Sequence, residues 1–231
     1  MLERDGSAVG ILLMIHSFIP GSAETRIRCS VSNWYVEPAL SSYGALLVSQ
    51  ALKHRDVTYV NSTPAAHTWP ILEAQGYVRH CDGVFVALPS LFQASDKARI
   101  QIVSSTSEYD GDIAPHDRDL LVAHADYGCL SVVCHAPDGA HPFVFLPRKK
   151  AGLLPFAYLA YCRDREDFVR FSGPLGRFLA RLGYAIVVLD SNGSIAGLVG
   201  HYVNNRPKYF KGPDRPRLGD LAYSELALFV G

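Results

Sequence analysis

Two stretches of the chain carry side chains that most directly suggest chemistry, and the first is rich in histidine and aspartate. His116, Asp117 and Asp119, followed by His124 and Asp126, bring imidazoles and carboxylates onto one predicted helix. Such groups bind metal ions or form acid–base pairs. The two histidines are eight residues apart, however, and the i, i+4 pairing of a helical zinc motif is absent. The spacing therefore favours helix capping by Asp117 and a partly exposed face, and we predict no metal site.

The second stretch is the segment Arg206–Arg217, which has the strongest local charge of the chain. It contains five cations, one anion and two aromatic residues among twelve. Two interpretations stay open: a loop that binds a phosphate-bearing ligand, with an aromatic ring stacked on a base, or a solvated loop that its prolines keep extended. The 22 basic and 22 acidic residues of the whole chain cancel. Because no overall field attracts a polyanion, nucleic-acid binding is disfavoured.

Composition describes a globular protein that buries a substantial core. Of 231 residues, 48% are apolar and 19% are charged, which fits one large or two small domains. The five cysteines include no C-x-x-C pair and are predicted to be reduced core residues. The longest apolar run, Ala8 to Ile15, is far shorter than the roughly 20 residues of a membrane-spanning helix. Since Glu3 and Asp5 spoil the basic leader of a signal peptide, we predict a buried strand there, a cytoplasmic protein and no membrane partner.

Hydrophobic periodicity and turn residues divide the chain into two α/β units. We expect a first unit over 1–90, a polar linker over 91–114 and a second unit over 115–231. The first unit is predicted to contain strands at 9–19, 26–36 and 57–61, helices at 39–53 and 68–75, and a strand pair over 77–88 that breaks at Asp82-Gly83. The second is predicted to contain helices at 116–125 and 175–182 and strands at 129–135, 142–146, 153–162, 184–190, 197–202 and 221–230.

The two units share an order of a long strand, a connection, a helix that bears glycine and a short apolar strand. Gly44-Ala45-Leu46-Leu47 in the first unit corresponds to Gly176-Arg177-Phe178-Leu179 in the second. Internal duplication and chance similarity both explain one pair of short matches.

Three segments carry a family resemblance: Trp34-Tyr35-Val36-Glu37-Pro38, Tyr43-Gly44-Ala45-Leu46-Leu47 and Ile71-Leu72-Glu73-Ala74-Gln75-Gly76-Tyr77. Together they resemble the GNAT superfamily of acyl-CoA N-acyltransferases. The likeness covers residues 8–88 and continues afterwards only in the order of elements. It implies an α+β fold, with a mixed, mainly antiparallel sheet and flanking helices, splayed where the pantetheine arm of the cofactor enters.

The resemblance implies a loop that binds the pyrophosphate of acetyl-CoA, or of another acyl-CoA, at a helix N-terminus. Gly44 matches the first glycine of that loop, Ser41 stands in place of the family's Gln or Arg, and Leu46 replaces a second small residue. A partial second match begins at Arg170 with Gly173, where the alternative is a simple turn before a helix. The cofactor-binding residues implied are Tyr35, Val36, Ser41, Ser42, Tyr43, Gly44, Ala45, Arg170, Gly173 and Gly176.

The resemblance also implies transfer of the acyl group to the amine of a small molecule. Glu37 is the implied general base, and the alternative is a solvated carboxylate at a strand end. Leu72 occupies the place of the tyrosine that acts as general acid in the family. Tyr77 occupies the place of an aromatic core residue. A catalytically degenerate protein that binds an anionic metabolite or a protein partner is therefore the second hypothesis.

The strand and two helices that open the family's fold have no counterpart before the strand predicted at 9–19. Either the natural chain begins upstream, or the second unit or a partner chain covers that edge. A homo-oligomer is one form of the second alternative.

Overall fold

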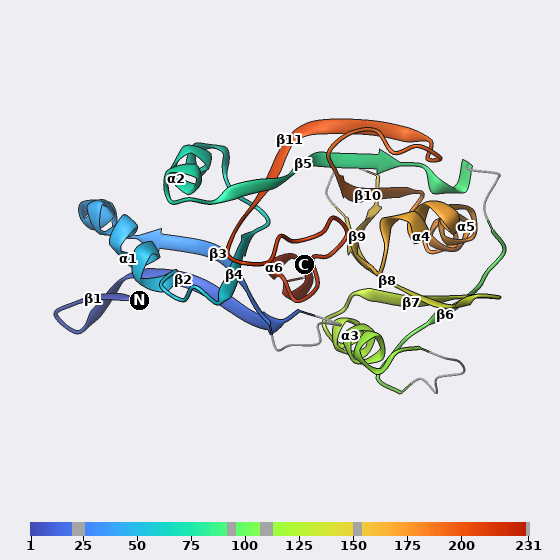
Figure 1. The fold of residues 1–231 in the computed structure, drawn as a ribbon, viewed down its shortest axis with the longest axis horizontal. Coiled ribbons are helices and arrows are strands. Elements are labelled where there is room, and N and C mark those ends of the chain that lie inside the picture. Colours follow the sequence, from blue (N-terminus) through green and yellow to red (C-terminus); the bar gives the residue numbers. More distant parts are fainter. Residues whose placement is uncertain (20–25, 92–95, 107–112, 150–153, 230–231) are drawn as a thin grey trace. The chain divides into compact units, whose positions relative to one another are not determined.

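The computed structural model describes residues 1–19, 26–91, 96–106, 113–149 and 154–229 (Figure 1). The chain forms two compact units. Unit 1 comprises Met1–His80 and Lys208–Pro216, and unit 2 comprises Cys81–Pro207 and Arg217–Gly231. Each unit is built around its own part of a mixed, mostly antiparallel sheet with flanking helices, as the sequence predicts.

Unit 1 is an antiparallel meander that ends in one parallel pair. Its strand order is β1-β2-β3-β4-β11, and only β3 and β4 run parallel. Alternate β-branched and aromatic residues of these strands face the core, where they meet residues of the helical connections. The elements are β1 (Leu2–Arg4), β2 (Ser7–Phe18), β3 (Ile27–Val36), 3-10 helix η1 (Pro38–Tyr43), α1 (Gly44–Ala51), β4 (Val57–Asn61), 3-10 helix η2 (Ala66–Thr68), α2 (Trp69–Ala74) and the end of β11 (Gly200–Lys211). The core contains Cys29, Val31, Val57, Tyr59, Leu72, Tyr77 and Tyr209.

Unit 2 has a sheet that is covered on both faces. Helices α4 and α5 cover one face and α3 the other (Figure 1). Phe143 and Phe145 of β8 pack toward α4 and α5, whereas the alternate residues Val144 and Leu146 pack toward α3. All four side chains are fully buried. Burial on both faces explains why these four consecutive residues of β8 are all apolar. The elements are β5 (Val78–Ala87), 3-10 helix η3 (Pro89–Leu91), β6 (Arg99–Ile102), α3 (Pro115–Asp126), β7 (Leu130–Ala136), β8 (Gly139–Arg148), β9 (Phe156–Cys162), α4 (Arg165–Arg170), α5 (Ser172–Arg181), β10 (Ile186–Ser191), β11 and α6 (Glu225–Leu228). The strand order is β11-β5-β10-β9-β8-β7-β6.

Two strands cross the division between the units. β5 begins in unit 1 and ends in unit 2, whereas β11 begins in unit 2 and ends in unit 1. The compact units therefore divide at His80 and interleave through 208–216, which differs from the boundaries at 90 and 115 expected from hydrophobic periodicity and turn residues. A pattern taken along the chain does not indicate that a later strand returns to an earlier unit.

The break predicted at Asp82-Gly83 is wrong, because β5 continues through both residues. A Cβ atom at Gly83 would lie 2.3 Å from the carbonyl oxygen of Val203 on β11. The glycine therefore serves a close approach between neighbouring strands, not a turn.

Two further predictions are corrected around unit 2. Residues 99–102, expected within a linker, form β6, which pairs with β7. Residues 221–230, expected as a strand, instead contain α6 at Glu225–Leu228. The basic segment is also not a loop throughout, since β11 continues to Lys211. The start of the strand predicted at 153–162 and the last residue of the one predicted at 221–230 lie outside the described residues.

Candidate functional site

The parallel strands β3 and β4 separate after four residue pairs. Their register runs from Ile27↔Val57 to Ser30↔Val60, yet β3 continues to Val36 while β4 ends at Asn61. On its other edge β3 stays paired with β2, and the register shifts between Leu12 and Leu13. This bulge bends β3 at the point where its partner is lost. The edge of β3 beyond Ser30 consequently opens.

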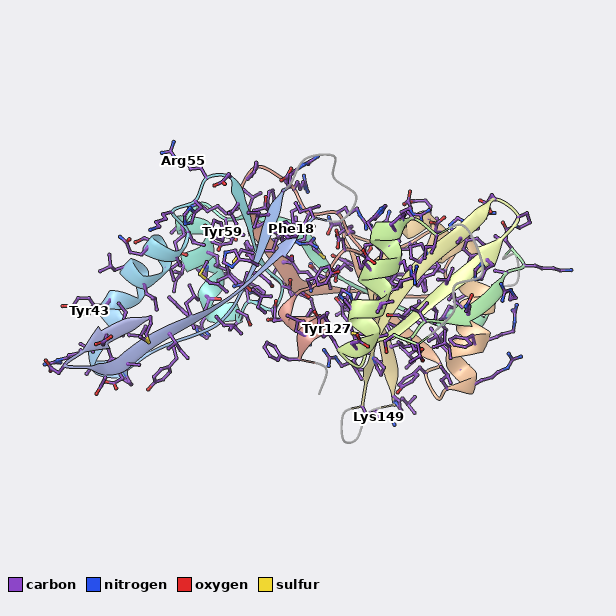
Figure 2. All side chains as sticks on the ribbon, turned by 90° about the horizontal axis from the view of Figure 1, so that it is seen from below. Phe18, Tyr43, Arg55, Tyr59, Tyr127 and Lys149 are labelled. Atoms are coloured by element: carbon purple, nitrogen blue, oxygen red, sulfur yellow. The ribbon has the colours of Figure 1, made fainter. Side chains whose placement is uncertain are left out.

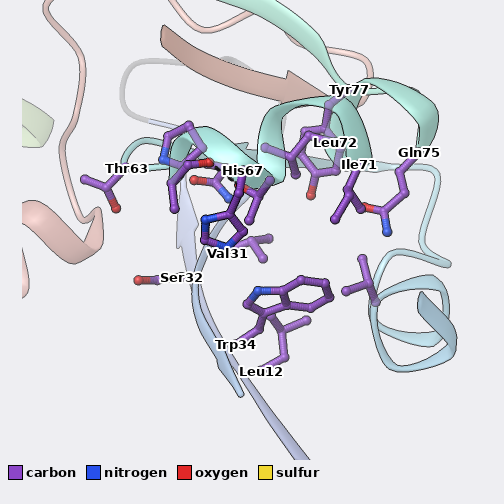
Figure 3. A pocket seen from close by; sticks show the side chains of 15 residues that line it. Leu12, Val31, Ser32, Trp34, Thr63, His67, Ile71, Leu72, Gln75 and Tyr77 are labelled. Carbon is purple, nitrogen blue, oxygen red and sulfur yellow. Dashed lines mark hydrogen bonds between the residues drawn. The ribbon is translucent and has the colours of Figure 1, made fainter. Parts of the chain in front are cut away.

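A cavity of about 290 Å³ lies at this opening (Figure 3). Its floor is β3, its sides come from α1 and α2, and the segment that follows β4 completes the wall. Figure 3 shows the Trp34 indole and the His67 ring entering from opposite sides. The lining residues are Leu12, Val31, Ser32, Trp34, Val48, Asn61, Thr63, Pro64, Ala65, His67, Thr68, Ile71, Leu72, Gln75 and Tyr77.

Local hydrogen bonds fix the segment between β4 and α2. The indole N–H of Trp69 donates to the carbonyl of Pro64 at 3.2 Å, and the hydroxyl of Thr68 donates to that of Ala65 at 2.7 Å. These bonds close the turn before α2 and hold the wall in which His67 is exposed. The pocket therefore combines apolar side chains with polar ones on a wall that local hydrogen bonds hold, as small-molecule sites do.

Tyr77 forms the buried end of the pocket and is 4% exposed. Burial, together with the neighbouring Cys29 and Tyr59, raises the pKa of its phenol well above the ordinary value. Its hydroxyl consequently stays protonated at neutral pH and keeps its capacity to donate a hydrogen bond.

No family model matches the chain, and no curated protein has a significant sequence match to it. Solved structures do share its architecture. A GCN5-related N-acetyltransferase from Anabaena variabilis superposes with a TM-score of 0.54 at 13% identity, over 90% of this chain and 60% of that one. A putative acetyltransferase from Pyrococcus horikoshii gives 0.50 at 12% identity, over 98% of this chain and 78% of that one.

The chain has the GNAT fold. The fold class predicted from the sequence is thereby confirmed. The chain spans only 60% of the length of the Anabaena protein. At these sequence identities the likeness establishes the fold alone. What the site can bind follows from the residues that form it.

The implied base of the GNAT resemblance, Glu37, lies just after β3. Its side chain is exposed, and its backbone N–H donates to the carbonyl of Val9 at 2.9 Å. Tyr35 and Val36 precede it, with Tyr35 58% exposed. None of these three residues is among those that line the pocket in the described part of the chain, whereas their neighbour Trp34 is.

The predicted phosphate loop of the GNAT fold is a 3-10 helix that leads into α1. The N–H of Gly44 already donates to the carbonyl of Ser41, so this amide is occupied within the chain. A Cβ atom at Gly44 would make ordinary contacts, at 3.5 Å from the nearest Trp34 atom, and the position therefore does not require glycine. The side chains of Ser42, Tyr43 and Ala45 are exposed, as Figure 2 shows for Tyr43.

The second predicted loop of the GNAT resemblance has other contacts. Arg170 donates to Asp96 at 2.5 Å and to both oxygens of Asp138 at 2.6 and 3.0 Å, so its guanidinium is engaged by two carboxylates. Gly173 is buried at the start of α5. A Cβ atom at Gly176 would lie 2.3 Å from the backbone nitrogen of Ser90, which makes this glycine a packing requirement between α5 and η3.

Asp117 and His124 of α3 have internal partners, whereas the side chains of His116, Asp119 and Asp126 are exposed. Asp117 is fully buried and accepts hydrogen bonds from Tyr161 at 2.9 Å and Arg163 at 2.6 Å. His124 donates from Nδ1 to the carbonyl of Leu120 at 2.7 Å and accepts the Tyr223 N–H at Nε2, which fixes a neutral tautomer. Among the described residues, no group of three or more His, Cys, Asp or Glu side chains is placed to hold a metal ion.

The cations of the basic segment bind mostly carbonyl oxygens. Lys208 donates to Ser62 at 2.9 Å and Lys211 to Gln75 at 2.7 Å. These bonds tie the end of β11 into unit 1 and favour a structural role for the two lysines.

The polar residues of the pocket wall are those that sequence reasoning missed. Thr63 and His67 follow β4 and belong to no motif, whereas Gln75, directly after α2, lies in the segment Ile71–Tyr77 that carries the resemblance but was given no role there. The available signal was topological, since ligands in α/β folds commonly bind beyond the carboxyl ends of parallel strands.

Proposed function

We propose that the chain is an acyl-CoA-dependent N-acyltransferase that binds its acyl-CoA in the pocket of unit 1. The observation that carries this proposal is the cavity where β3 and β4 separate. A strand edge that has lost its partner presents free N–H and C=O groups, and the pantetheine arm of coenzyme A carries two amides that match them. The apolar lining from Val31, Trp34 and Leu72 suits the hydrocarbon parts of that arm.

Transfer to an amine requires a small set of groups around the thioester. The amine nitrogen attacks the carbonyl carbon, the C–S bond breaks, the amine loses a proton and the thiolate gains one. Glu37 is the base that the resemblance implies. His67 is the base that the pocket supports, because its exposed imidazole stands in the wall and imidazole is the side chain used most often for proton transfer.

We further propose that the two units arose by duplication. The succession β2, β3, helices, β4 in unit 1 matches β8, β9, helices, β10 in unit 2. In both, an antiparallel pair with a register shift is followed by a parallel partner.

A second candidate function is binding of an anionic ligand without turnover. It is favoured by the exposure of Glu37 outside the residues that line the pocket, which leaves the base implied by the resemblance away from the site. A small-molecule acceptor, a homo-oligomer and a cytoplasmic location stay predictions. No helix in the described ranges is long and apolar enough to cross a membrane.

The test is calorimetric titration with acetyl-CoA of the wild type and of two matched variants of α2. Ile71→Trp places an indole at the pocket, whereas Ala74→Trp places the same side chain on the same helix at an exposed position outside the lining. We expect binding by the wild type and Ala74→Trp and its loss in Ile71→Trp. Equal affinities in all three proteins would refute the assignment of the pocket.

Thiol release with a panel of amines then separates the two candidate functions. Turnover supports the transferase. Saturable binding with no release of thiol for any amine supports the binding protein.

A further inference from the structure

Unit 2 repeats the strand separation of unit 1. The parallel strands β9 and β10 pair only from Phe156↔Ile186 to Tyr158↔Val188, while β9 continues to Cys162. The register between β8 and β9 shifts directly beyond that point, between Val144 and Phe145. Geometry of the kind that forms the pocket in unit 1 is therefore present a second time.

In unit 2 the opened edge is occupied by the chain itself. The N–H of Leu221 donates to the carbonyl of Ala160 at 2.7 Å, and the N–H of Cys162 donates to the carbonyl of Gly219 at 3.0 Å. Tyr161 and Asp220 form an antiparallel bridge between these two bonds. Because β8 pairs with the other edge of β9 as far as Cys162, this segment lies on the edge that β10 has left.

We name residues Arg217–Ala222 the closing segment, and several contacts hold it in place. Arg217 donates to the carbonyl of Cys162 at 2.6 Å, and its guanidinium lies 5.3 Å from the centre of the Tyr161 ring. Leu221 and Ala222 are 3% and 2% exposed and belong to the core beneath α3. The segment is thus held in unit 2 by backbone hydrogen bonds and by buried side chains.

Gly219 makes this approach possible. Its φ is +81°, and a Cβ atom there would lie 2.9 Å from the sulfur of Cys162. Any other residue would face both a left-handed backbone and a steric conflict. The closing segment therefore depends on glycine at this position.

The helix that follows β9 is also unsuited to a phosphate. Asp164 caps α4 by accepting the N–H of Glu166, and Glu166 and Asp167 lie in its first turn. Three carboxylates at a helix N-terminus stabilise the helix but repel an anion. In the groove beside α4, Arg170 is engaged by Asp96 and Asp138.

We infer that the closing segment takes the place of an acyl-CoA arm in unit 2, so that the chain binds a single acyl-CoA, in unit 1. This inference rests on the proposed function. The backbone groups of Ala160 and Cys162 that a pantetheine amide would need are bonded to the chain's own Gly219 and Leu221. In unit 1 the corresponding edge, at Val31, Ser32 and Trp34, faces the pocket.

Stoichiometry tests the inference. Titration of the full chain with acetyl-CoA is expected to give one site per chain, which disappears in Ile71→Trp and persists in Ala74→Trp. Two sites per chain, or one site that survives Ile71→Trp, would overturn the inference. Absence of any binding would refute the proposed function. The second experiment does not depend on acetyl-CoA and tests whether the closing segment is stably bonded to β9.

That experiment is hydrogen exchange at single amides without ligand. The amides of Cys162 and Leu221 are expected to exchange as slowly as those of the β8–β9 pair. Gly219→Val is expected to speed both at least about tenfold, because it forces a left-handed conformation on a β-branched residue. Gly193→Ala, where the Cβ atom would meet open space, is the control and is expected to change neither. Fast exchange of the two amides in the wild type would overturn the segment's role.

Discussion

The hydroxyl of Tyr158 on β9 donates a hydrogen bond to the carboxylate of Asp190 on β10, two residues beyond the last pair of these parallel strands. Asp190 is 2% exposed. Burial, followed by the charge of Asp190 and the hydrogen bond to it, raises the pKa of Tyr158. The phenol therefore remains a donor and links β9 to β10 at the point where their pairing ends.

Tyr158→Phe removes one donor from a buried carboxylate while it keeps the ring. We expect the free energy of unfolding to fall by about 1–3 kcal/mol, because a buried acceptor loses a hydrogen bond. Urea unfolding of Tyr158→Phe, Asp190→Asn and the double variant measures the coupling. Strict additivity of the two single effects would show that the bond does not stabilise unit 2.

Strands and helices were predictable where sequence pattern and fold agree. Strand β4 was expected at 57–61 and is found at Val57–Asn61, because a β-branched run is bounded by turn residues on both sides. Helix α3 was expected at 116–125 and is found at Pro115–Asp126. Gly83 shows the limit, since only the neighbouring strand explains a glycine inside β5.

The candidate site was less predictable than the fold. Trp34 belongs to a segment that the resemblance singled out, but its neighbours Tyr35 and Glu37 do not line the pocket in the described residues. Which of these side chains reaches the opening depends on the bulge in β3, where one extra residue shifts the alternation of side chains between the two faces. His67 joins the site through the path of the chain after β4, and Gln75 joins it at the end of α2, within the segment Ile71–Tyr77 that carries the resemblance.

Gly176→Ala is expected to destabilise unit 2 strongly. The new methyl group would lie 2.3 Å from the nitrogen of Ser90 and 2.6 Å from the carbonyl carbon of Pro89, and backbone atoms cannot yield as a flexible side chain does. We expect a loss of about 2–4 kcal/mol in the free energy of unfolding. Gly193→Ala is the matched control, and thermal unfolding of both measures the difference. A loss no greater than that of the control would contradict the packing role of Gly176.

His80 makes the stability of unit 1 depend on pH. Burial, then the positive charges of Lys208, Arg215 and Arg28, lowers its pKa from 6.5 to about 4. In the unfolded chain His80 binds a proton below about pH 6.5, whereas in the folded chain it binds one only below about pH 4. The free energy of unfolding therefore falls as the pH decreases through this window. The expected loss between pH 7.5 and 5 is about 2 kcal/mol.

His80→Gln should remove the part of the pH dependence of the free energy of unfolding that His80 causes. Urea unfolding at the two pH values measures it, with His54→Gln, an exposed histidine, as the control. The same fall in His80→Gln as in the wild type would show that other groups cause it.

Gly44→Ala is expected to stabilise unit 1 by about 0.5–1 kcal/mol. Its backbone is helical, with φ −58° and ψ −41°, and the Cβ atom would make only ordinary contacts. If the pyrophosphate of acetyl-CoA approaches this residue closely, the same variant weakens binding. Thermal unfolding and calorimetry together separate the two effects, and unchanged affinity in a stabilised protein would remove Gly44 from the cofactor site.

The base is the last assignment to be tested, through His67→Gln and Glu37→Gln. His67 stands in the pocket wall, whereas Glu37 is exposed outside the lining residues. We therefore expect kcat to fall about 100-fold or more in His67→Gln, the usual loss for a general base, with the affinity for acetyl-CoA kept. Glu37→Gln is expected to retain most of the rate. Because glutamine preserves size and polarity in both variants, a large loss of kcat in Glu37→Gln alone would return the base to the strand end that the GNAT resemblance implies.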